Sequence, residues 1–182
     1  MNNFAYKTAY LVDPKFPEPI LTAMTDQVKD LEYDRSTVYP NEKVFEGRTS
    51  ADAWFAWDKW IAGIMHNIAI SANNDYFHYD IDHFDSRIQA TRYEVGQRYG
   101  WHVDQADFGR LPRKLSMSLV LDTEFEGGEL EIFSPSAHET VTFDIKPGHV
   151  CIFPSWISHQ VKPVTSGTRY SLVAWMNGPE FK

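Results

Sequence analysis

The chain contains little cysteine, no long apolar run and no excess of positive charge. Cys151 is the single cysteine among 182 residues, so an internal disulfide is excluded and nothing indicates a disulfide-rich secreted scaffold. No apolar run approaches the length that crosses a bilayer, and the N-terminus lacks the basic and apolar segments of a signal peptide. The net charge of -8 disfavours binding to phosphate backbones, which depends on Lys and Arg. We therefore expect a cytoplasmic protein with no nucleic-acid or membrane partner, and leave its oligomeric state open.

The composition is that of one globular domain. Hydrophobic residues make up 43% and charged residues 23% of the chain, while aromatic residues reach 15% and favour a large buried core. A chain of this length predicts a single domain over residues 1–182. We expect residues 1–75 to form an N-terminal helical support and residues 76–178 to form a β core.

Two helices are expected before residue 76. The first is predicted over 18–31, because apolar residues recur there at helical spacing, and a short strand is predicted before it, within 1–15. The second begins at a cap formed by Thr49 or Ser50, with Asp52 in its first turn, and ends before Asn73. One face of it is apolar: Trp54, Trp57, Ile61, Ile64, Met65 and Ile68. This face predicts packing against a sheet, with a partner-binding surface as the alternative. Residues 34–49 are expected to form a loop, either a surface connection or a lid.

From residue 76 onward, short extended segments alternate with turn signals. Eight strands are predicted: Ile88–Val95, Arg98–Val103, Leu115–Asp122, Glu129–Ser134, Thr140–Ile145, Val150–Pro154, His159–Val161 and Arg169–Met176. Strands of this number and size predict a barrel or a sandwich of two sheets, with the helices packed outside. Cys151 and Met117 are expected in the core. The residues from Glu124 to Glu126 are expected to form a solvated turn, with an acidic rim that prefers a basic peptide substrate as the alternative.

Three His-x-Asp pairs could contribute to a metal site, and one stands out. His102 and Asp104 are two residues apart, so an extended strand directs both side chains to the same face. Gly96 and Gly100 beside them permit close backbone approach. The pairs that begin at His78 and His83 lack such surroundings, and we interpret them as surface or satisfied polar groups.

A third ligand must come from a distant segment, where the candidates are His138, His149 and His159. We choose His159, because it opens a predicted strand and only it is followed, ten residues later, by an arginine, Arg169. Two imidazoles and one carboxylate leave part of a metal's coordination sphere open, as in non-haem Fe(II) oxygenases. An arginine facing into a barrel requires a partner, and a carboxylate is the natural one, although a surface charge is the alternative. Ser171 would add a hydroxyl donor to the same carboxylate, with an ordinary polar strand position as the alternative.

Together these residues resemble the prolyl 4-hydroxylase-like Fe(II)/2-oxoglutarate dioxygenases, most closely the PKHD-type hydroxylases, from about Tyr79 to Trp175. The matching segments are Tyr93-x-x-Gly96-Gln97-x-Tyr99-x-x-His102-x-Asp104, Gly127-Gly128-Glu129-Leu130, Lys146-Pro147-Gly148, Phe153-Pro154-Ser155 and His159-x-Val161-x-Pro163-Val164-Thr165-x-Gly167-x-Arg169. The resemblance does not cover the first 75 residues.

The resemblance implies a double-stranded β-helix of the jelly-roll or cupin type, with the metal at its open end. By position, His102, Asp104 and His159 match the iron ligands. Arg169 matches the residue that pairs with the far carboxylate of 2-oxoglutarate, and Tyr93 matches a tyrosine of the same pocket. Tyr99 and Trp175 match positions on the substrate side. The segment Ser116–Val120 lacks a tyrosine with which some relatives hold the cosubstrate, so the contacts besides Arg169 stay open.

The implied reaction consumes 2-oxoglutarate and O2 with Fe(II), releases succinate and CO2, and hydroxylates an unactivated carbon; ascorbate is a further cofactor that the resemblance allows. The presence of Asp104 favours hydroxylation over halogenation. A prolyl residue in a peptide or protein is the leading substrate, followed by a free amino acid or other small molecule. A nucleobase ranks third, because Trp175 stands where base-repairing relatives carry a second arginine. The alternative from another class is a metal-binding barrel without catalysis.

Overall fold

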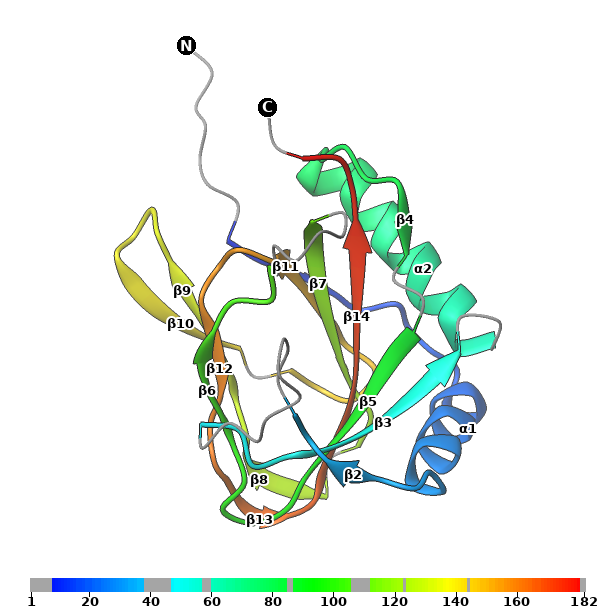
Figure 1. Ribbon diagram of the computed structural model, residues 1–182. Helices are drawn as coiled ribbons and strands as arrows, with labels where there is room; N and C mark the ends of the chain where they lie inside the picture. The colour runs from blue at the N-terminus through cyan, green and yellow to red at the C-terminus, as the bar shows by residue number, and fades with distance from the viewer. Residues whose placement is uncertain are drawn as a thin grey trace.

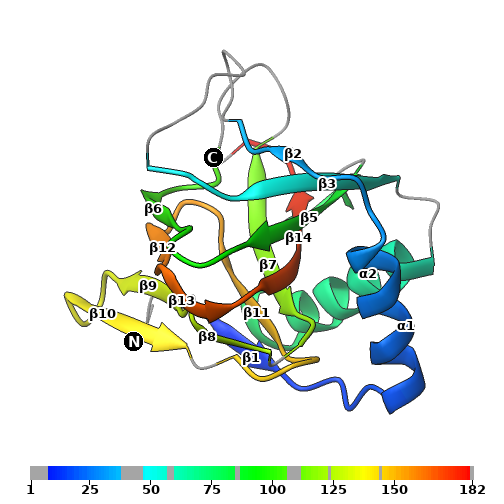
Figure 2. The same cartoon turned by 90° about the horizontal axis from the view of Figure 1, so that it is seen from below.

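The computed structural model describes residues 8–37, 47–56, 60–84, 87–105, 112–122, 124–143 and 145–180. Helix α1 spans Glu18–Lys29, and helix α2 spans Trp60–Ala72 and continues into one π-helical turn. Both helices cover one face of a large antiparallel sheet, while a smaller sheet lies across its other face (Figures 1 and 2). The two-sheet architecture predicted from the strand pattern is therefore confirmed.

The large sheet has the strand order β1-β11-β7-β14-β5-β3-β2, and β4 pairs with β14. Its strands are β1 (Tyr10–Val12), β2 (Asp34–Arg35), β3 (Ala51–Ala56), β4 (His83–Phe84), β5 (Arg87–Tyr93), β7 (Arg113–Val120), β11 (Val150–Pro154) and β14 (Arg169–Asn177). The smaller sheet has the order β10-β9-β12-β6, and β13 pairs with β8. These strands are β6 (Tyr99–His102), β8 (Phe125–Gly127), β9 (Leu130–Ser134), β10 (Glu139–Phe143), β12 (His159–Val161) and β13 (Val164–Gly167).

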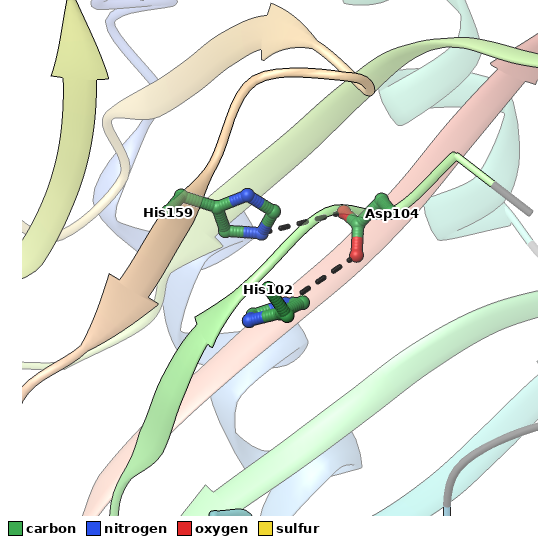
Figure 3. A group of neighbouring side chains, drawn as sticks. All are labelled: His102, Asp104 and His159. Atoms are coloured by element: carbon green, nitrogen blue, oxygen red, sulfur yellow. Dashed lines mark ion pairs between the residues drawn. The ribbon is translucent and has the colours of Figure 1, made fainter.

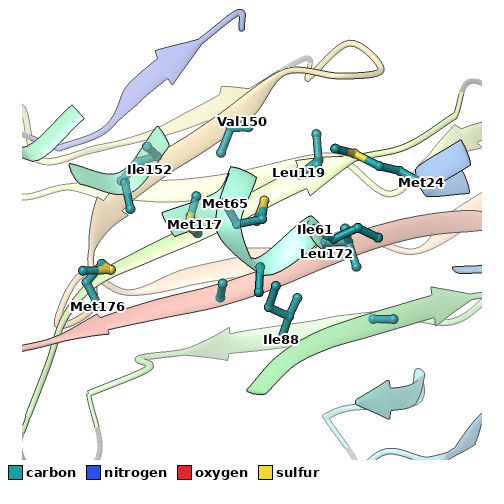
Figure 4. Packing of buried hydrophobic residues seen from close by; sticks show 14 of the residues in the cluster. Met24, Ile61, Met65, Ile88, Met117, Leu119, Val150, Ile152, Leu172 and Met176 are labelled. Carbon is teal, nitrogen blue, oxygen red and sulfur yellow. The ribbon is translucent and has the colours of Figure 1, made fainter. Parts of the chain in front are cut away.

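The two faces of the large sheet differ in chemistry because successive side chains of a strand point to opposite faces. One face carries aliphatic residues that pack against the helices, including Ile88, Leu119 and Leu172 (Figure 4). Met24 of α1 and Met65 of α2 complete this core and are fully buried. Each such side chain contributes about 1.5–3 kcal/mol through burial.

The opposite face, turned toward the smaller sheet, carries buried polar residues. Residues paired across neighbouring strands share a face, and Ser171 of β14 pairs with Thr91 of β5 and with Val120 of β7. Further along the same two strands, Trp175 of β14 pairs with Ser116 of β7. A buried polar face is costly unless it is hydrogen-bonded or serves a ligand. The polar face therefore indicates that a binding site lies in the interior, between the two sheets.

The predicted start of the second helix is wrong. Residues 51–56 form strand β3, which pairs with β5, and the helix begins only at Trp60. Thr49 and Ser50 do not cap it: the Thr49 amide donates to the Arg98 carbonyl, and the Ser50 hydroxyl bonds that of Ser36. Asp52 and Trp54, predicted in the first turn and on the apolar face of the helix, lie on β3 instead. The predicted end and the packing hold, since α2 ends at Ala72 and packs on the sheet. Trp57 lies outside the described residues.

Three further expectations need correction. Asp34–Arg35 form β2, so the predicted loop over 34–49 is partly a strand, and Arg48 makes a bridge with Tyr99. Positions 38–46 lie outside the described residues, which leaves the lid hypothesis untested. Phe125–Gly127 form β8 rather than a turn. The segment before residue 76 is thus more than a helical support, because it also supplies β1, β2 and β3.

The strand β4 was not predicted either, and it adds His83–Phe84 beside the end of β14. Within the ranges given above, no helix is both long enough and apolar enough to span a membrane.

Candidate active site

His102, Asp104 and His159 come together between the two sheets (Figure 3). His102 is the last residue of β6 and faces His159, the first residue of β12, across the strand pair. Asp104 lies two residues past the end of β6, where its amide donates to the Ser155 carbonyl. The ligand atoms of the three side chains lie within 4.8 Å of one another. It is the one such group of metal-ligating side chains among the described residues.

Both imidazoles are held in the form that binds a metal through Nε2. Nδ1 of His102 donates to the Gly100 carbonyl at 2.8 Å, and Nδ1 of His159 donates to the Ile157 carbonyl at 3.0 Å. Because a carbonyl can only accept, each ring keeps a proton on Nδ1, which leaves Nε2 as the atom that can bind a metal. The two Nε2 atoms lie 3.5 and 3.6 Å from the Asp104 carboxylate oxygens.

The charge states of Asp104 and His159 also suit metal binding. Burial raises the pKa of the Asp104 carboxyl, but the neighbouring His159 and His102 outweigh it and hold that pKa well below its usual range. Burial lowers the pKa of His159, and a cation that binds at Nε2 displaces any proton there. An ionised carboxylate and a neutral imidazole are the ligand forms that a divalent cation requires.

Two hydrogen bonds from the large sheet orient Asp104. Its Oδ2 accepts from the Ser116 hydroxyl at 2.8 Å and from the Trp175 indole N–H at 2.9 Å. Such outer contacts to a metal-binding carboxylate fix its direction. Sequence reasoning missed both contacts and assigned Trp175 to the substrate side only. The signal it could have used is the strand alternation, which sends Ser116 and Trp175 to the interior face.

A second set of contacts holds His102 from its other side. The Tyr99 ring stacks on His102 with centroids 3.5 Å apart, and the guanidinium of Arg48 lies 4.6 Å from the Tyr99 ring centroid. Burial raises the pKa of Tyr99 to about 12. Arg48 is itself buried and donates to the Asp52 carboxylate at 2.7 Å. Sequence reasoning also missed Arg48, because it lies in the predicted loop.

Arg169 begins β14 and points into the interior, as the strand alternation predicted. It is 2% exposed, and its Nη1 donates to the Ser171 hydroxyl at 2.9 Å. Its guanidinium lies 5.5 Å from the ring centroid of Tyr93, the residue paired with it on β5. A pocket beside it is lined by Phe125, Gly128 and Leu130, among others. No carboxylate of the described residues forms an ion pair with Arg169, so a buried cation faces a pocket.

Tyr93 and Ser171 complete the surroundings of this cation. Burial raises the pKa of the Tyr93 phenol more than the two nearby arginines lower it, so the hydroxyl stays neutral and able to donate. The hydroxyl of Ser171 accepts from Arg169 and keeps its own proton for a ligand. A neutral phenol, a hydroxyl and a guanidinium form a donor set that suits a carboxylate.

The other candidate histidines do not join the site. His78 is exposed at the end of the π-helical turn, and His138 is exposed in the turn between β9 and β10. His83 contacts the Asn177 amide at 3.2 Å, and His149 lies 3.4 Å from the Asp13 carboxylate. The interpretation of His78 and His83 as surface or satisfied groups thus agrees with their positions.

Known proteins resemble this chain in sequence and in structure. A PKHD-type hydroxylase of Synechococcus sp. (strain CC9605) is 40% identical over 88 residues, which cover 47% of this chain and 39% of that protein. A PKHD-type hydroxylase of Gloeothece citriformis (strain PCC 7424) is 36% identical over 90 residues, or 47% of this chain and 40% of the relative. The chain thus spans about two fifths of the length of the curated relatives that it matches.

Solved structures share the fold at low sequence identity. The prolyl-4-hydroxylase of Pseudomonas putida has a TM-score of 0.72 at 19% identity, with 97% of this chain and 95% of that chain covered. A prolyl hydroxylase of Trichoplax adhaerens, solved with a hypoxia inducible factor peptide fragment, has a TM-score of 0.79 at 18% identity. The superposition covers 94% of this chain and 84% of that hydroxylase chain. These likenesses confirm the double-stranded β-helix. Residues 88–177, about half of the chain, match the model of the 2OG-Fe(II) oxygenase superfamily, and the chain belongs to that superfamily.

Proposed function

We propose that this chain is an Fe(II)- and 2-oxoglutarate-dependent dioxygenase that hydroxylates a prolyl residue of a peptide or protein and releases succinate and CO2. The observation that carries the proposal is the joint presence of the His102, Asp104 and His159 group and the buried guanidinium of Arg169. The matched superfamily and the prolyl hydroxylases of similar fold support it. As further parts of the proposal, residues 1–182 form one domain and the protein is cytoplasmic.

Each residue then has a defined task. His102, Asp104 and His159 would hold Fe(II), which supplies open positions for a 2-oxo acid and O2 and carries the oxidation. Arg169 would bind the far carboxylate of 2-oxoglutarate, with Tyr93 and Ser171 as further donors.

The surrounding residues orient these groups. Ser116 and Trp175 hold the Asp104 carboxylate in place, and Tyr99 supports the His102 ring. Trp175 and Tyr99 also lie beside the group where a substrate would approach. His159 is buried and His102 and Asp104 are half-buried, which limits the access of bulk water to the reacting atoms.

The proposal is tested by adding Fe(II) and then 2-oxoglutarate to the metal-free protein without oxygen. The wild type should show the weak visible absorption band of a 2-oxo acid chelated to Fe(II). His159→Ala should lose the band, and Arg169→Ala should require far more 2-oxoglutarate to produce it. Arg98→Ala removes an exposed arginine and should leave the band unchanged.

The outcome also separates the alternatives. If the iron-loaded wild type shows no band, the cosubstrate assignment is wrong and the non-catalytic metal-binding barrel replaces it. If the band forms, succinate release with prolyl peptides and with free amino acids, with and without ascorbate, decides between a peptide substrate and a small molecule. Higher turnover of a free amino acid than of every peptide would contradict the prolyl proposal.

A further inference from the structure

Ser118 lies on β7, which runs between β11 and β14 in the middle of the large sheet (Figure 1). It is two residues from Ser116, whose hydroxyl donates to Asp104, so its side chain points to the same interior face. Across the neighbouring strands it pairs with Cys151 of β11 and with Val173 of β14. The Ser118 hydroxyl is therefore one of the polar groups that face the smaller sheet.

The position of Ser118 is halfway between the two ends of the candidate active site. At one end, Trp175 of β14 donates to the metal-ligating group; at the other, Ser171 of the same strand accepts from Arg169. Ser118 pairs with Val173, which stands midway between these two residues of β14. Four residues of a strand advance about 13 Å. A ligand that reaches from the metal-ligating group to the guanidinium therefore passes Ser118 at about its middle.

The Ser118 hydroxyl has no hydrogen-bond partner within the part of the chain that the structure describes, although Ser118 is only 7% exposed. Its neighbours Val173 and Cys151 offer neither a strong donor nor a strong acceptor. Ser116, by contrast, is satisfied by hydrogen bonds of 2.8 and 2.9 Å. Val173 keeps partial exposure although strands pair with it on both sides, so the interior is open over this pair of residues.

A buried hydroxyl without a protein partner requires water or a ligand group. The central carbon of 2-oxoglutarate is a methylene, which can neither donate nor accept. Binding of 2-oxoglutarate therefore replaces water at Ser118 by an apolar group and leaves the hydroxyl unpaired, which costs affinity. A hydroxyl on the central carbon of the same chain would restore the hydrogen bond.

We propose that Ser118 makes this pocket selective for a five-carbon dicarboxylate with a hydroxyl on its central carbon, which competes with 2-oxoglutarate. Arg169 binds one carboxylate, the metal site takes the other, and Ser118 bonds the hydroxyl between them. Because a hydroxyl both donates and accepts, either partner can supply the proton. The inference rests on the proposed function for the places of the two carboxylates, and it adds a class of inhibitor to it.

The test compares glutarate with 3-hydroxyglutarate, which differ only by the central hydroxyl. Isothermal titration calorimetry on the Zn(II)-loaded protein gives a Kd for each acid without turnover, and 2-oxoglutarate is titrated in the same series. The wild type should bind 3-hydroxyglutarate about fivefold more tightly than glutarate, the ratio expected for one neutral hydrogen bond. With the Fe(II)-loaded protein, 3-hydroxyglutarate should raise the KM for 2-oxoglutarate in succinate release.

Two variants locate the effect. Ser118→Ala should abolish the preference and should bind glutarate at least as tightly as the wild type, because no hydroxyl is then left unpaired. Ser134→Ala is the matched control, since Ser134 is also a buried strand serine but bonds the Thr8 hydroxyl and lies on the smaller sheet. This variant should keep the fivefold preference.

Several results would overturn the role of Ser118. Equal Kd values for the two acids in the wild type, or a preference that Ser118→Ala retains, would show that the serine only makes room. A loss of 2-oxoglutarate binding in Ser118→Ala as large as the loss of 3-hydroxyglutarate binding would show that the hydroxyl serves the cosubstrate itself. If none of the three acids binds, the pocket is wrongly assigned and the inference is refuted.

The outcomes also separate this inference from the proposed function. If 2-oxoglutarate binds and supports succinate release but the two glutarates do not differ, the proposed function stands and the role of Ser118 fails. If the preference depends on Ser118 but no peptide or amino acid yields succinate, the proposed function fails and the selective dicarboxylate site stands.

Discussion

Adding one methyl group at Gly128 should weaken 2-oxoglutarate binding by displacing the side chain of Arg169. Gly128 adopts a φ of +65°, and a Cβ built on it would lie 2.8 Å from Cδ of Arg169 and 3.1 Å from Cγ2 of Val164. Ordinary van der Waals contact begins at about 3.4 Å, so the Arg169 side chain must move by roughly half an ångström or more. Arg169 is fully enclosed, and any shift misaligns its guanidinium with the pocket.

The magnitude follows from two separate costs. A non-glycine residue in the left-handed region costs about 1–2 kcal/mol of stability. Loss of one charge-assisted hydrogen bond between Arg169 and the ligand carboxylate costs about 1.5–3 kcal/mol. The second cost applies only to ligand binding, so the Kd of 2-oxoglutarate should rise about tenfold or more in Gly128→Ala.

Gly96→Ala is the matched control. Gly96 also has a positive φ, +83°, but nothing lies within 4 Å of its added Cβ. Both variants should lose free energy of unfolding in urea through the backbone cost, and Gly128→Ala should lose more because its Cβ also overlaps Arg169 and Val164. Only Gly128→Ala should bind 2-oxoglutarate more weakly in an anaerobic titration of the iron-loaded protein. Equal Kd values for the two variants would refute the argument that Arg169 holds the cosubstrate in this pocket.

Three shorter predictions address other contacts. Trp175→Phe removes the indole donor to Asp104 and should weaken Zn(II) binding about tenfold in competition with a chromophoric chelator; unchanged affinity would deny the contact a role. Arg48→Met leaves Asp52 buried without its cation and should lower the free energy of unfolding in urea by about 3 kcal/mol. Burial raises the pKa of the Asp52 carboxyl, and a carboxyl whose pKa is raised by folding makes the protein less stable as pH rises. The loss of unfolding free energy in Arg48→Met should therefore be smaller at pH 5 than at pH 7. A larger loss at pH 5 would contradict this. Burial also raises the pKa of the Cys151 thiol, so iodoacetamide should label it only after unfolding, and rapid labelling of the native protein would be inconsistent with its position.

Local pattern was sufficient to predict most of the β core. The alternation in β14 placed Arg169 and Ser171 on one face, and burial of both agrees with it. The two-residue spacing of His102 and Asp104 likewise predicted that they act together. Both features follow from the spacing of residues that are close together in the sequence, so they can be predicted without knowledge of the fold.

Features decided by distant contacts were not predicted. The segment 51–56 has alanines and aromatics at positions compatible with both a helix and a strand, and pairing with β5 decides for the strand. The hydrogen bond from Trp175 to Asp104 joins residues 71 positions apart, and their proximity depends on the register between β14 and β7. His159 was chosen because an arginine follows it, and its position opposite His102 came only from the fold.

Arg48, Tyr99 and His102 stack on one another, so the segment before residue 88 contacts the metal-ligating group through Arg48 and Tyr99. The superfamily match begins at residue 88, yet Arg48 reaches the His102 ring through a single intervening aromatic ring. Substitutions in the earlier segment can therefore tilt one ligand while the matched residues stay the same. A change in that segment would then adjust the reactivity of the centre from outside the residues that the superfamily model matches.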